Sequence, residues 1–401
     1  MLSEILSIRK EQIFAANRVD LISAENENLA APLLHRLAFG EDKLNQVIRG
    51  LHALCDLPDP INKTLSATEL APSLNLYRIS CPIGVIGVIF ESRPDALIQI
   101  SSLCIKSGNA VLLKGGREAL KTNQILCECV REALSRTGLP ANTAQLLETR
   151  DDVAQMLKED TLIDLIIPRG SNGFVRYIMD NSRIPVLGHS DGICHVYIDR
   201  SAEIDTALKV SLDSKTQNVS VCNAMETLLV HSDIAPVFLP EAARVFASSG
   251  VEIRGDEETG KLIDCIPASE SDWSTEYLDY ILSIRIVGSL QDAVDHINRF
   301  GSHHTDCIVT NDAETASAFM NRVDSAGVYW NVSTRFADGF VYGLGAEVGI
   351  ATGKLHARGP MGLEGLTTYK YKLIGSGQTM TEVRNGMISY THRPLDKECP
   401  F

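Results

Sequence analysis

Val85-Ile86-Gly87-Val88-Ile89-Phe90 is a continuous apolar run, and Glu91-Ser92-Arg93-Pro94 follows it directly. Short apolar runs of this kind are typical of strands that are buried on both faces of a parallel sheet. A helix is expected over residues 95–107, and Gly108-Asn109 ends it. The pattern predicts a strand–turn–helix unit whose turn carries polar residues.

The same unit recurs along the first half of the chain. Strands are expected at 110–113, 162–167, 185–187 and 195–198, and helices at about 118–136 and 173–181. Apolar strands that alternate with helices predict an α/β fold with a doubly wound parallel sheet. Ligands of such sheets bind at the carboxyl ends of the strands, where this chain carries residues 92–93, 114–116, 169–172 and 188–192.

A second α/β run is expected after residue 201, with helices at 202–214, 234–248, 290–300 and 312–325 and strands at 227–231, 281–287, 306–310 and 327–330. Residues 1–56 show helical periodicity, while residues 338–365 are rich in glycine and are predicted to form loops. Residues 64–82 and 366–374 are expected to be extended and to form an arm that leaves the body of the protein.

The overall composition argues against two classes of partner. The 401 residues carry a net charge of −14, which is unlike a nucleic-acid-binding surface. No stretch approaches the roughly 18 apolar residues of a membrane span, so no membrane partner is expected. The sequence shows no secretory signal, and its ten cysteines are interpreted as reduced thiols of a cytoplasmic protein. Their spacing is not that of a zinc site, so no metal site is assigned.

Cys222 lies in the segment Asn218-Val-Ser-Val-Cys222-Asn-Ala-Met-Glu-Thr227, between an expected helix and an expected strand. Nucleophilic thiols occur in loops of this kind, where a thiolate is partly exposed and meets hydrogen-bond donors. Free cysteine is also among the most buried residue types, so a thiol in such a place is more often part of a core. The local sequence leaves both interpretations open.

Several cations lie near glycine-rich strand ends. Lys114 precedes Gly115 and Gly116, and this pattern can hold a phosphate or form an ordinary turn. Cations that can bind an anion or face solvent also occur at Arg169, Arg335, His356 and Arg358. No strand end carries the G-x-G-x-x-G fingerprint. Together with one cysteine in a loop, these cations suggest acyl chemistry on an anionic substrate through a thioester.

Longer motifs carry a resemblance to a known family. They are Phe90-Glu-Ser-Arg-Pro-Asp95, Leu113-Lys-Gly-Gly116, Ile167-Pro-Arg-Gly-Ser-Asn172, Pro185-Val-Leu-Gly-His189, Cys222-Asn-Ala-Met-Glu-Thr-Leu-Leu229, Ser333-Thr-Arg-Phe-Ala-Asp-Gly339, Gly345-Ala-Glu-Val-Gly349 and His356-Ala-Arg-Gly-Pro360. From the first helix to about Gln378, the chain resembles the γ-glutamyl phosphate reductases (glutamate-5-semialdehyde dehydrogenases), a branch of the aldehyde dehydrogenase superfamily. It looks most similar to the free-standing eukaryotic, fungal-type form, because the kinase domain of the fused synthases is not found in it.

The resemblance implies an aldehyde-dehydrogenase-like fold with a Rossmann-type cofactor domain, an α/β catalytic domain and an extended oligomerisation arm. Residues 1–200, with a returning segment at about 355–365, would bind NADPH, and residues 201–354 would form the catalytic domain. Residues at about 64–82 and 366–401 would form the arm and the tail. A homodimer or homotetramer is expected, and glutamate 5-kinase is a candidate partner.

The resemblance also implies a reaction, the NADPH-dependent reduction of L-glutamyl 5-phosphate to L-glutamate 5-semialdehyde and phosphate. This is the second step of proline biosynthesis from glutamate. Cys222 would attack the acyl phosphate and hold a thioester. Hydrolytic aldehyde dehydrogenases carry a water-activating glutamate where this chain has Gly188, and its absence suits an enzyme that passes its thioester to hydride.

By similarity, three groups of residues would form the site. The catalytic group consists of Cys222, Asn223 and Ser92. The cofactor-binding group consists of Lys114, Gly116, Arg117, Gly188 and Glu276. For Glu276, a surface carboxylate is an equally good interpretation. The substrate-binding group consists of Arg169, Asn331, Arg335, His356 and Arg358, with no division of roles among them.

The chain departs from the family pattern at several positions. Residues 218–221 replace a proline-containing approach to the nucleophile, Ser190 replaces an alanine and Val341 replaces an arginine. These departures put turnover rate and substrate affinity in doubt more than the reaction class. Two other functions stay open, and the changes at 218–221 and 341 motivate the second. One is a thioester-forming semialdehyde dehydrogenase that acts on a different acyl phosphate or on an acyl-CoA. The other is a weakly active homologue that serves as a scaffold for a glutamate kinase.

Overall fold

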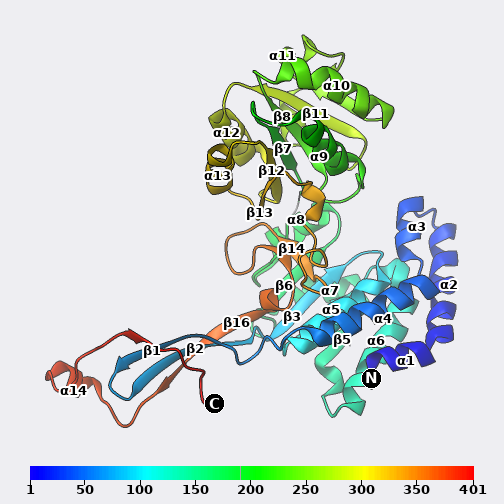
Figure 1. The fold of residues 1–401 in the computed structure, drawn as a ribbon. Helices are drawn as coiled ribbons and strands as arrows, with labels where there is room; N and C mark the ends of the chain where they lie inside the picture. The colour runs from blue at the N-terminus through cyan, green and yellow to red at the C-terminus, as the bar shows by residue number, and fades with distance from the viewer. Residues whose placement is uncertain (190) are drawn as a thin grey trace.

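The computed structural model describes residues 1–189 and 191–401, so Ser190, one of the departures named above, lies outside the described residues. Figure 1 shows a helix-rich unit from the first part of the chain, a second α/β unit above it and a long arm that extends away from both. The two units contain separate parallel sheets, which confirms the predicted α/β class.

The first unit contains a four-stranded parallel sheet in the order β5-β4-β3-β6. Its central strand β3 (Val85–Phe90) has the predicted bounds and is buried from Ile86 onward. The helix expected after it is α5 (Pro94–Lys106), which begins with a proline in its first turn. The other elements are β4 (Ala110–Lys114), α6 (Leu120–Arg136), β5 (Ala144–Leu146), α7 (Arg150–Met156), β6 (Leu165–Arg169) and α8 (Asn172–Asn181).

The N-terminal part is helical, as predicted, and comprises α1 (Leu2–Ile8), α2 (Lys10–Asn26), α3 (Ala31–Leu37) and α4 (Glu41–Asp56). Buried polar side chains fix these helices to α6. Asn17 donates to Thr122 Oγ1 at 3.2 Å, and Asp20 accepts from the Thr122 backbone N–H at 2.8 Å. Arg36 on α3 donates to the carbonyl oxygen of Ser220 at 3.3 Å. The N-terminal helices therefore reach the segment that precedes Cys222.

The second unit is a seven-stranded sheet in the order β10-β9-β11-β8-β7-β12-β13, and every pairing in it is parallel. Its strands are β7 (Cys194–Ile198), β8 (Met225–His231), β9 (Glu252–Gly255), β10 (Ile266–Pro267), β11 (Ile281–Val287), β12 (Thr305–Val309) and β13 (Gly327–Trp330). Its helices are α9 (Ile204–Thr216), α10 (Ala235–Ser248), α11 (Glu257–Gly260), α12 (Leu290–Phe300) and α13 (Ala313–Arg322).

The strand over 194–198 differs in its partners from the sequence-based expectation. It was expected to continue the first sheet, but β7 pairs with β8 and β12 in the second sheet. Residues 185–187 contribute only one isolated bridge, between Val186 and Ile166. An apolar run indicates that a strand is buried but does not specify its neighbours, and this explains the difference.

The arm is an antiparallel sheet in the order β16-β2-β1-β17. It contains β1 (Thr64–Ala71), β2 (Leu74–Pro82), β16 (Thr367–Ile374) and β17 (Arg393–Pro394), with the short helix α14 (Met380–Arg384) beside it. The strand expected at 366–374 pairs with the earlier hairpin, in register from Thr367 opposite Pro82 to Ile374 opposite Asn75. This pairing confirms that both segments form one arm.

The glycine-rich segment 338–365 contains regular structure that was not predicted. Gly349–Ala351 (β14) and Gly359–Met361 (β15) form a two-stranded antiparallel ribbon. In and beside this ribbon, the buried residues Val348, Met361 and Leu363 belong to the core of the first unit. The chain therefore returns from the second unit to the first before it enters the arm. Among the described residues, no helix has the length and apolar character needed to cross a membrane.

Candidate active site

Cys222 lies between α9 and β8, at the amino edge of the seven-stranded sheet. His304 immediately precedes β12, and Cys194 begins β7, so both lie at the same edge. The Cys222 thiol is partly exposed, whereas Cys194 is buried. The carboxyl end of β6 in the other sheet carries Arg169, which lies within electrostatic range of Cys222. The site thus lies between the carboxyl edge of one sheet and the amino edge of the other.

Side-chain-to-backbone contacts with neighbouring residues hold the Cys222 segment in place. Thr334 Oγ1 donates to the carbonyl oxygen of Asn223 at 2.7 Å, and the Asn223 side chain donates to the carbonyl oxygen of Ala337 at 2.9 Å. Cys194 Sγ lies 3.3 Å from the carbonyl oxygen of Cys222. Asn223 is 5% exposed. Its side chain therefore fixes the loop after the nucleophile.

His304 is the side chain that contacts the Cys222 thiol. Its Nε2 lies 3.2 Å from Sγ, and its Nδ1 lies 2.9 Å from Thr305 Oγ1. His304 is 1% exposed. His189 stands edge-on to it, with ring centroids 5.1 Å apart, and His189 Nδ1 lies 3.0 Å from the carbonyl oxygen of Ile350. A histidine within hydrogen-bond distance of a thiol can accept its proton, which makes Cys222 a better nucleophile.

Gly192 is packed against the backbone of Cys222. A Cβ atom at position 192 would lie 2.2 Å from the Cys222 carbonyl oxygen and 2.4 Å from its Cα. Such distances are far inside van der Waals contact, and the opposing atoms are backbone atoms that cannot rotate away. The residue at 192 must therefore be glycine for Cys222 to keep this position.

Glu276 lies on the same side of the site. Its Oε2 accepts from Asn172 Nδ2 at 2.5 Å. Burial raises the pKa of Glu276, while the Asn172 side chain, the charge of His189 and the Gly192 N–H oppose that rise. The sequence left open whether Glu276 lies within the site or on the surface. These contacts favour a carboxylate within the site.

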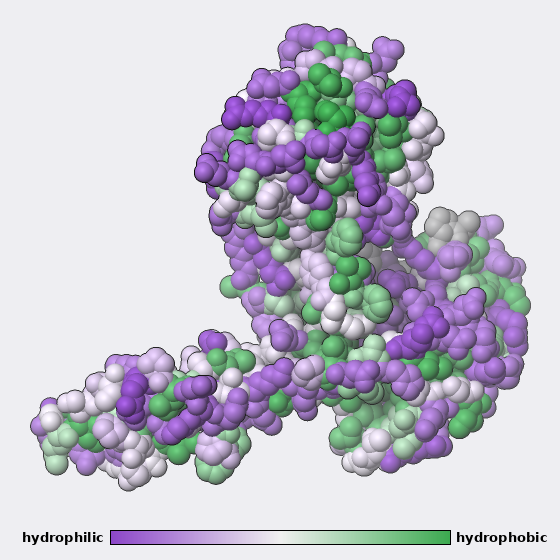
Figure 2. All heavy atoms as spheres, in the orientation of Figure 1, coloured by the Kyte–Doolittle hydropathy of each residue, from purple (hydrophilic) through white to green (hydrophobic). Residues whose placement is uncertain are grey.

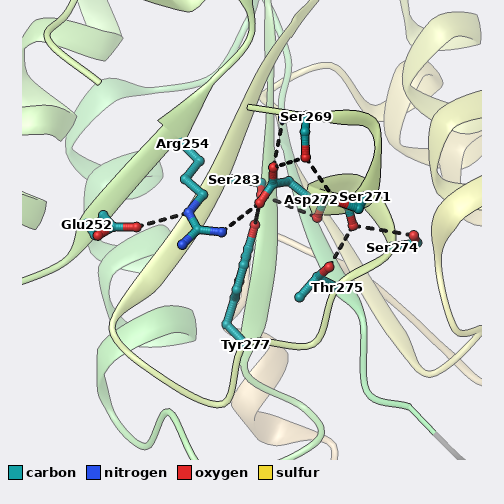
Figure 3. A network of polar contacts seen from close by, with 9 residues as sticks. All are labelled: Glu252, Arg254, Ser269, Ser271, Asp272, Ser274, Thr275, Tyr277 and Ser283. Atoms are coloured by element: carbon teal, nitrogen blue, oxygen red, sulfur yellow. Dashed lines mark hydrogen bonds and ion pairs between the residues drawn. The ribbon is translucent and has the colours of Figure 1, made fainter. Parts of the chain in front are cut away.

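A polar network fixes the segment that carries Glu276. Figure 3 shows Asp272 at its centre, where it accepts from Arg254 Nη1 at 2.8 Å and from Tyr277 Oη at 2.7 Å. The Tyr277 hydroxyl also lies 2.7 Å from Ser283 Oγ on β11. Burial raises the pKa of Tyr277 to about 12, so its hydroxyl keeps the proton that it donates. The residue next to Glu276 is thereby attached to the sheet.

A buried ion pair lies at the base of the Cys222 segment. Lys215 in the last turn of α9 and Glu226 on β8 are both 0% exposed, and Nζ donates to Oε2 at 2.6 Å. Glu226 Oε1 also accepts from the Leu278 N–H at 3.3 Å. Burial raises the pKa of Glu226 to about 7 and lowers that of Lys215, and their mutual attraction opposes both shifts. The pair joins the two ends of the nucleophile loop to the Glu276 segment.

Two arginines place positive charge beside the thiol. Burial lowers the pKa values of Arg169 and Arg335; at Arg169 the nearby Arg93 adds to this shift and Glu347 opposes it, and a thiolate at Cys222 would act on both guanidinium groups. Arg169 Nη2 lies 3.5 Å from Glu347 Oε1, and Arg335 Nε donates to Gln217 Oε1 at 2.9 Å. Partly desolvated guanidinium groups favour an anionic ligand, because an anion replaces the water that they have lost.

The predicted cofactor-binding residues of the first unit form a second group. Lys114 ends β4 and is 7% exposed, and its Nζ donates to the Gly115 carbonyl oxygen at 2.6 Å. Ser92 donates to Glu118 Oε1 through its N–H at 2.7 Å and its hydroxyl at 2.6 Å. The Glu118 carboxylate lies against Gly116. Ser92, predicted as a catalytic residue, is thus bonded into the group around Gly116.

The remaining predicted residues have structural contacts of their own. Asn331 exchanges hydrogen bonds with the backbone of Thr310, and Arg117 pairs with Glu27. Arg358 binds Asp324 through Nη1 at 2.9 Å and the Thr352 carbonyl oxygen through Nε at 3.1 Å. His356 Nε2 lies 2.8 Å from the Gly365 carbonyl oxygen, and a side chain at position 188 would begin against Pro168. Cys222, Asn223, Arg169, Arg335 and Glu276 are the predicted residues that come together.

Sequence reasoning did not identify His304, His189 and Glu347 as site residues. His189 and Glu347 lie within motifs that carried the resemblance, so attention to the ionisable residues of those motifs would have found them. His304 lies 82 residues from Cys222 in the chain, next to His303 and directly before an apolar strand. A histidine at the start of a buried strand is a weak indication of a site residue.

Comparison with known proteins gives consistent results. The sequence model of the aldehyde dehydrogenase family matches residues 6–264. The chain is 58% identical over 400 residues to a γ-glutamyl phosphate reductase of Acetivibrio thermocellus, with 100% of this chain and 93% of that protein covered. The crystal structure of γ-glutamyl phosphate reductase from Thermotoga maritima superposes with a TM-score of 0.92 at 38% identity, covering 94% of this chain and 92% of that one.

The expectation of a fungal-type form is not supported. Bacterial and archaeal relatives share between 49% and 58% of the sequence. The structure of γ-glutamyl phosphate reductase from Saccharomyces cerevisiae is 38% identical, with 95% of this chain and 91% of that chain covered and a TM-score of 0.50. This chain also covers 93% of the Acetivibrio protein, so the length of the matched region does not distinguish a fungal form from a bacterial one.

The contact between Gly192 and Cys222 can be tested by Gly192→Ala. The added methyl group must displace the Cys222 backbone, and a displacement of about 1 Å at a nucleophile lowers kcat/KM by about 100-fold. Steady-state kinetics would measure the loss. Gly50→Ala is the matched control, since a Cβ at position 50 in α4 meets nothing within 4 Å. Equal losses in the two variants would contradict the role of Gly192.

The buried ion pair can be tested by Lys215→Met. The substitution leaves Glu226 buried without its cation, which costs about 3–5 kcal/mol of unfolding free energy. The double variant Lys215→Met/Glu226→Met removes both charges and should recover most of that loss. Urea unfolding followed by circular dichroism would measure both. A double variant that is less stable than the single one would refute this account of the pair.

Proposed function

The chain belongs to the γ-glutamyl phosphate reductases of the aldehyde dehydrogenase family, and we propose that it reduces L-glutamyl 5-phosphate to L-glutamate 5-semialdehyde, with release of phosphate, in proline biosynthesis. The observation that carries this proposal is the partly exposed Cys222, whose thiol lies 3.2 Å from His304 and within electrostatic range of the half-buried Arg169 and Arg335, in a chain that matches these enzymes along its whole length.

Cys222 is the nucleophile. Its proton passes to His304 Nε2, and Sγ attacks the acyl carbon of the substrate. The bond from carbon to the phosphate oxygen then breaks, and the proton held by His304 goes to that oxygen, so phosphate leaves as hydrogen phosphate. An acyl thioester remains on Cys222. The Cys222 backbone N–H and the Asn223 amide are the proposed donors to the oxyanion, and each such donor contributes about 3–4 kcal/mol.

Reduction of the thioester requires a hydride, and NADPH supplies it when bound. The residues of the first unit fit that cofactor, because a buried cation, Lys114, lies beside two glycines at the carboxyl end of β4. Lys114, Gly116 and Arg117 are proposed to hold the adenosine ribose and its 2′-phosphate. Glu276 is proposed to hold the nicotinamide ribose, and its attachment through Tyr277 keeps it in place.

The site disfavours hydrolysis of the thioester. Position 188 has no side chain, and one placed there would begin 3.2 Å from Pro168 Cγ. The chain thus lacks the carboxylate that hydrolytic relatives use at this position to activate water. After the hydride has been received, collapse of the thiohemiacetal expels the Cys222 thiolate, releases the aldehyde and takes up one proton from solvent.

Arg169 and Arg335 are the proposed binding groups for the substrate phosphate and the α-carboxylate. Both guanidinium groups are buried enough for their pKa values to fall, and both are influenced by the charge at Cys222. Asn331, His356 and Arg358 are proposed to support the site indirectly, because their contacts hold the loops around it.

The arm is proposed to mediate a homodimer or homotetramer. Alternate residues of β16, namely Tyr369, Tyr371 and Leu373, are 50%, 60% and 58% exposed, and Figure 2 shows apolar patches along the arm. Within the described part of the chain, β16 also has a neighbouring strand on one side only. An apolar strand edge favours pairing with another chain.

We also propose a cytoplasmic location and glutamate 5-kinase as the partner that supplies the labile acyl phosphate.

The reverse reaction tests the function. With pyrroline-5-carboxylate, which is in equilibrium with the semialdehyde, and NADP⁺, turnover should require inorganic phosphate and should disappear in Cys222→Ala. NADPH formation would be followed by absorbance. Turnover that depends on CoA and not on phosphate would instead establish the rival thioester-forming activity. Equal activity of Cys222→Ala and wild type would exclude the thioester route.

The role of His304 can be tested by His304→Gln, which keeps a polar side chain but cannot carry the proton. We expect kcat to fall by about 10²–10⁴-fold, as for loss of a general acid–base group, while the KM for phosphate changes little. His303→Asn is the neighbouring control, because His303 contacts the Asp324 carbonyl oxygen instead of the thiol. A similar fall in both variants would mean that the loop geometry matters and not the imidazole at 304.

A further inference from the structure

Three side-chain atoms that could bind a metal ion lie close together at Cys222. One nitrogen of His189, one nitrogen of His304 and the Cys222 thiol all lie within 4.8 Å of one another. The three residues come from separate segments, before β7, before β12 and before β8. Their proximity is therefore a property of the fold, and the spacing of residues in the sequence does not reveal it.

The two imidazoles are oriented as metal ligands are. His189 Nδ1 lies 3.0 Å from the Ile350 carbonyl oxygen, which can only accept a hydrogen bond, so Nε2 is the ring nitrogen that is left to bind a metal. His304 Nδ1 contacts Thr305 Oγ1 at 2.9 Å, and its Nε2 faces Sγ at 3.2 Å. A metal-binding histidine typically donates its other N–H to a carbonyl or another fixed acceptor, and this contact sets its tautomer and its ring orientation.

The donor set suits Zn²⁺ among the common divalent ions. A thiolate and two imidazoles are the borderline-soft ligands that zinc prefers, while Mg²⁺ and Ca²⁺ require oxygen ligands. In a tetrahedral site with bonds of about 2.0–2.3 Å, ligand atoms lie about 3.3–3.8 Å apart. The present spacing allows this geometry after side-chain shifts of roughly 1 Å. A fourth position would remain open to solvent.

We propose that His189, Cys222 and His304 form a binding site for Zn²⁺, and that the bound ion reversibly inhibits the enzyme. The metal takes the thiolate as a ligand and displaces the proton, so Cys222 is no longer available to attack an acyl carbon. The binding rests on the geometry of the three side chains. The inhibition additionally rests on the proposed function of Cys222 as the nucleophile.

The chain also offers a competing surface pair. His52 and Cys55 are both exposed and lie three residues apart on α4, so they face the same side of the helix. Such a pair can capture zinc weakly without any relation to catalysis. His52→Ala is therefore the matched control, because it removes the surface pair and leaves the active-site cluster unchanged.

The experiment uses the full chain after treatment with a chelator. Co²⁺ is titrated in as a spectroscopic substitute for Zn²⁺, and Zn²⁺ affinity is then obtained by competition with a chromophoric chelator. We expect one equivalent of Co²⁺ to produce a sulfur-to-metal charge-transfer band that is lost in Cys222→Ser and kept in His52→Ala. Zn²⁺ affinity should fall more than tenfold in His189→Ala. Protection of Cys222 from iodoacetamide by Zn²⁺, read by mass spectrometry, provides a second measure.

Circular dichroism and the unfolding midpoint establish that each variant is folded, and His189→Gln replaces His189→Ala if the latter is not. The proposal is overturned if the wild type shows no charge-transfer band, if His52→Ala abolishes binding, or if the folded His189 variant binds Zn²⁺ as tightly as the wild type. Because binding is measured without turnover, an enzyme that fails to act on pyrroline-5-carboxylate would contradict the proposed function and leave the metal site intact. Conversely, stoichiometric binding without loss of turnover would overturn the inhibition.

Discussion

The buried ion pair between Lys215 and Glu226 is the constraint on which the site depends. Two charges without access to water persist only when each satisfies the other, so the packing of α9 on β8 must keep these two side chains in contact. The loop that carries Cys222 covers residues 217–224, and Lys215 and Glu226 lie in the last turn of the helix before it and at the start of the strand after it. Because Glu226 also accepts from the Leu278 N–H, the same pair attaches the segment that carries Glu276. One interaction therefore positions both the nucleophile and a proposed cofactor-binding carboxylate.

The site lies between the carboxyl edge of the first sheet and the amino edge of the second. Strand ends of the first sheet contribute the cations and the backbone of the proposed cofactor site, while strand starts of the second sheet contribute Cys222, His304 and the turn with Gly192. The returning segment 338–365 packs into the first core and contributes Glu347, which faces Arg169. This arrangement places positive charge at the thiol of a protein whose net charge is −14. An anionic substrate is thus favoured locally on an acidic surface.

Much of the fold could be predicted because periodicity is a local property. The strand Val85–Phe90, the N-terminal helices and the arm strands follow from runs of apolar residues and from turn residues that lie next to each other in the chain. The assignment of β7 to the first sheet was wrong, because the apolar sequence of a fully buried strand does not specify which strands pair with it. The ribbon at 349–361 was missed, since glycine-rich segments show no periodicity although they can pair closely.

The family and the reaction class could be read from the amino-acid sequence alone, and so could Cys222 as the proposed nucleophile. These depend on residue types at fixed positions within continuous motifs, and Cys222 and Asn223 belong to one of them. The packing of the whole chain was needed to show that His304 and His189 lie close to the thiol, that Gly192 packs against Cys222, and that Arg358 and Asn331 make hydrogen bonds to Asp324 and Thr310. Those relations join residues from distant segments, and the positions of such segments are set by the packing of two sheets against shared helices and loops. No local pattern encodes a distance of this kind, because it is a result of the whole core.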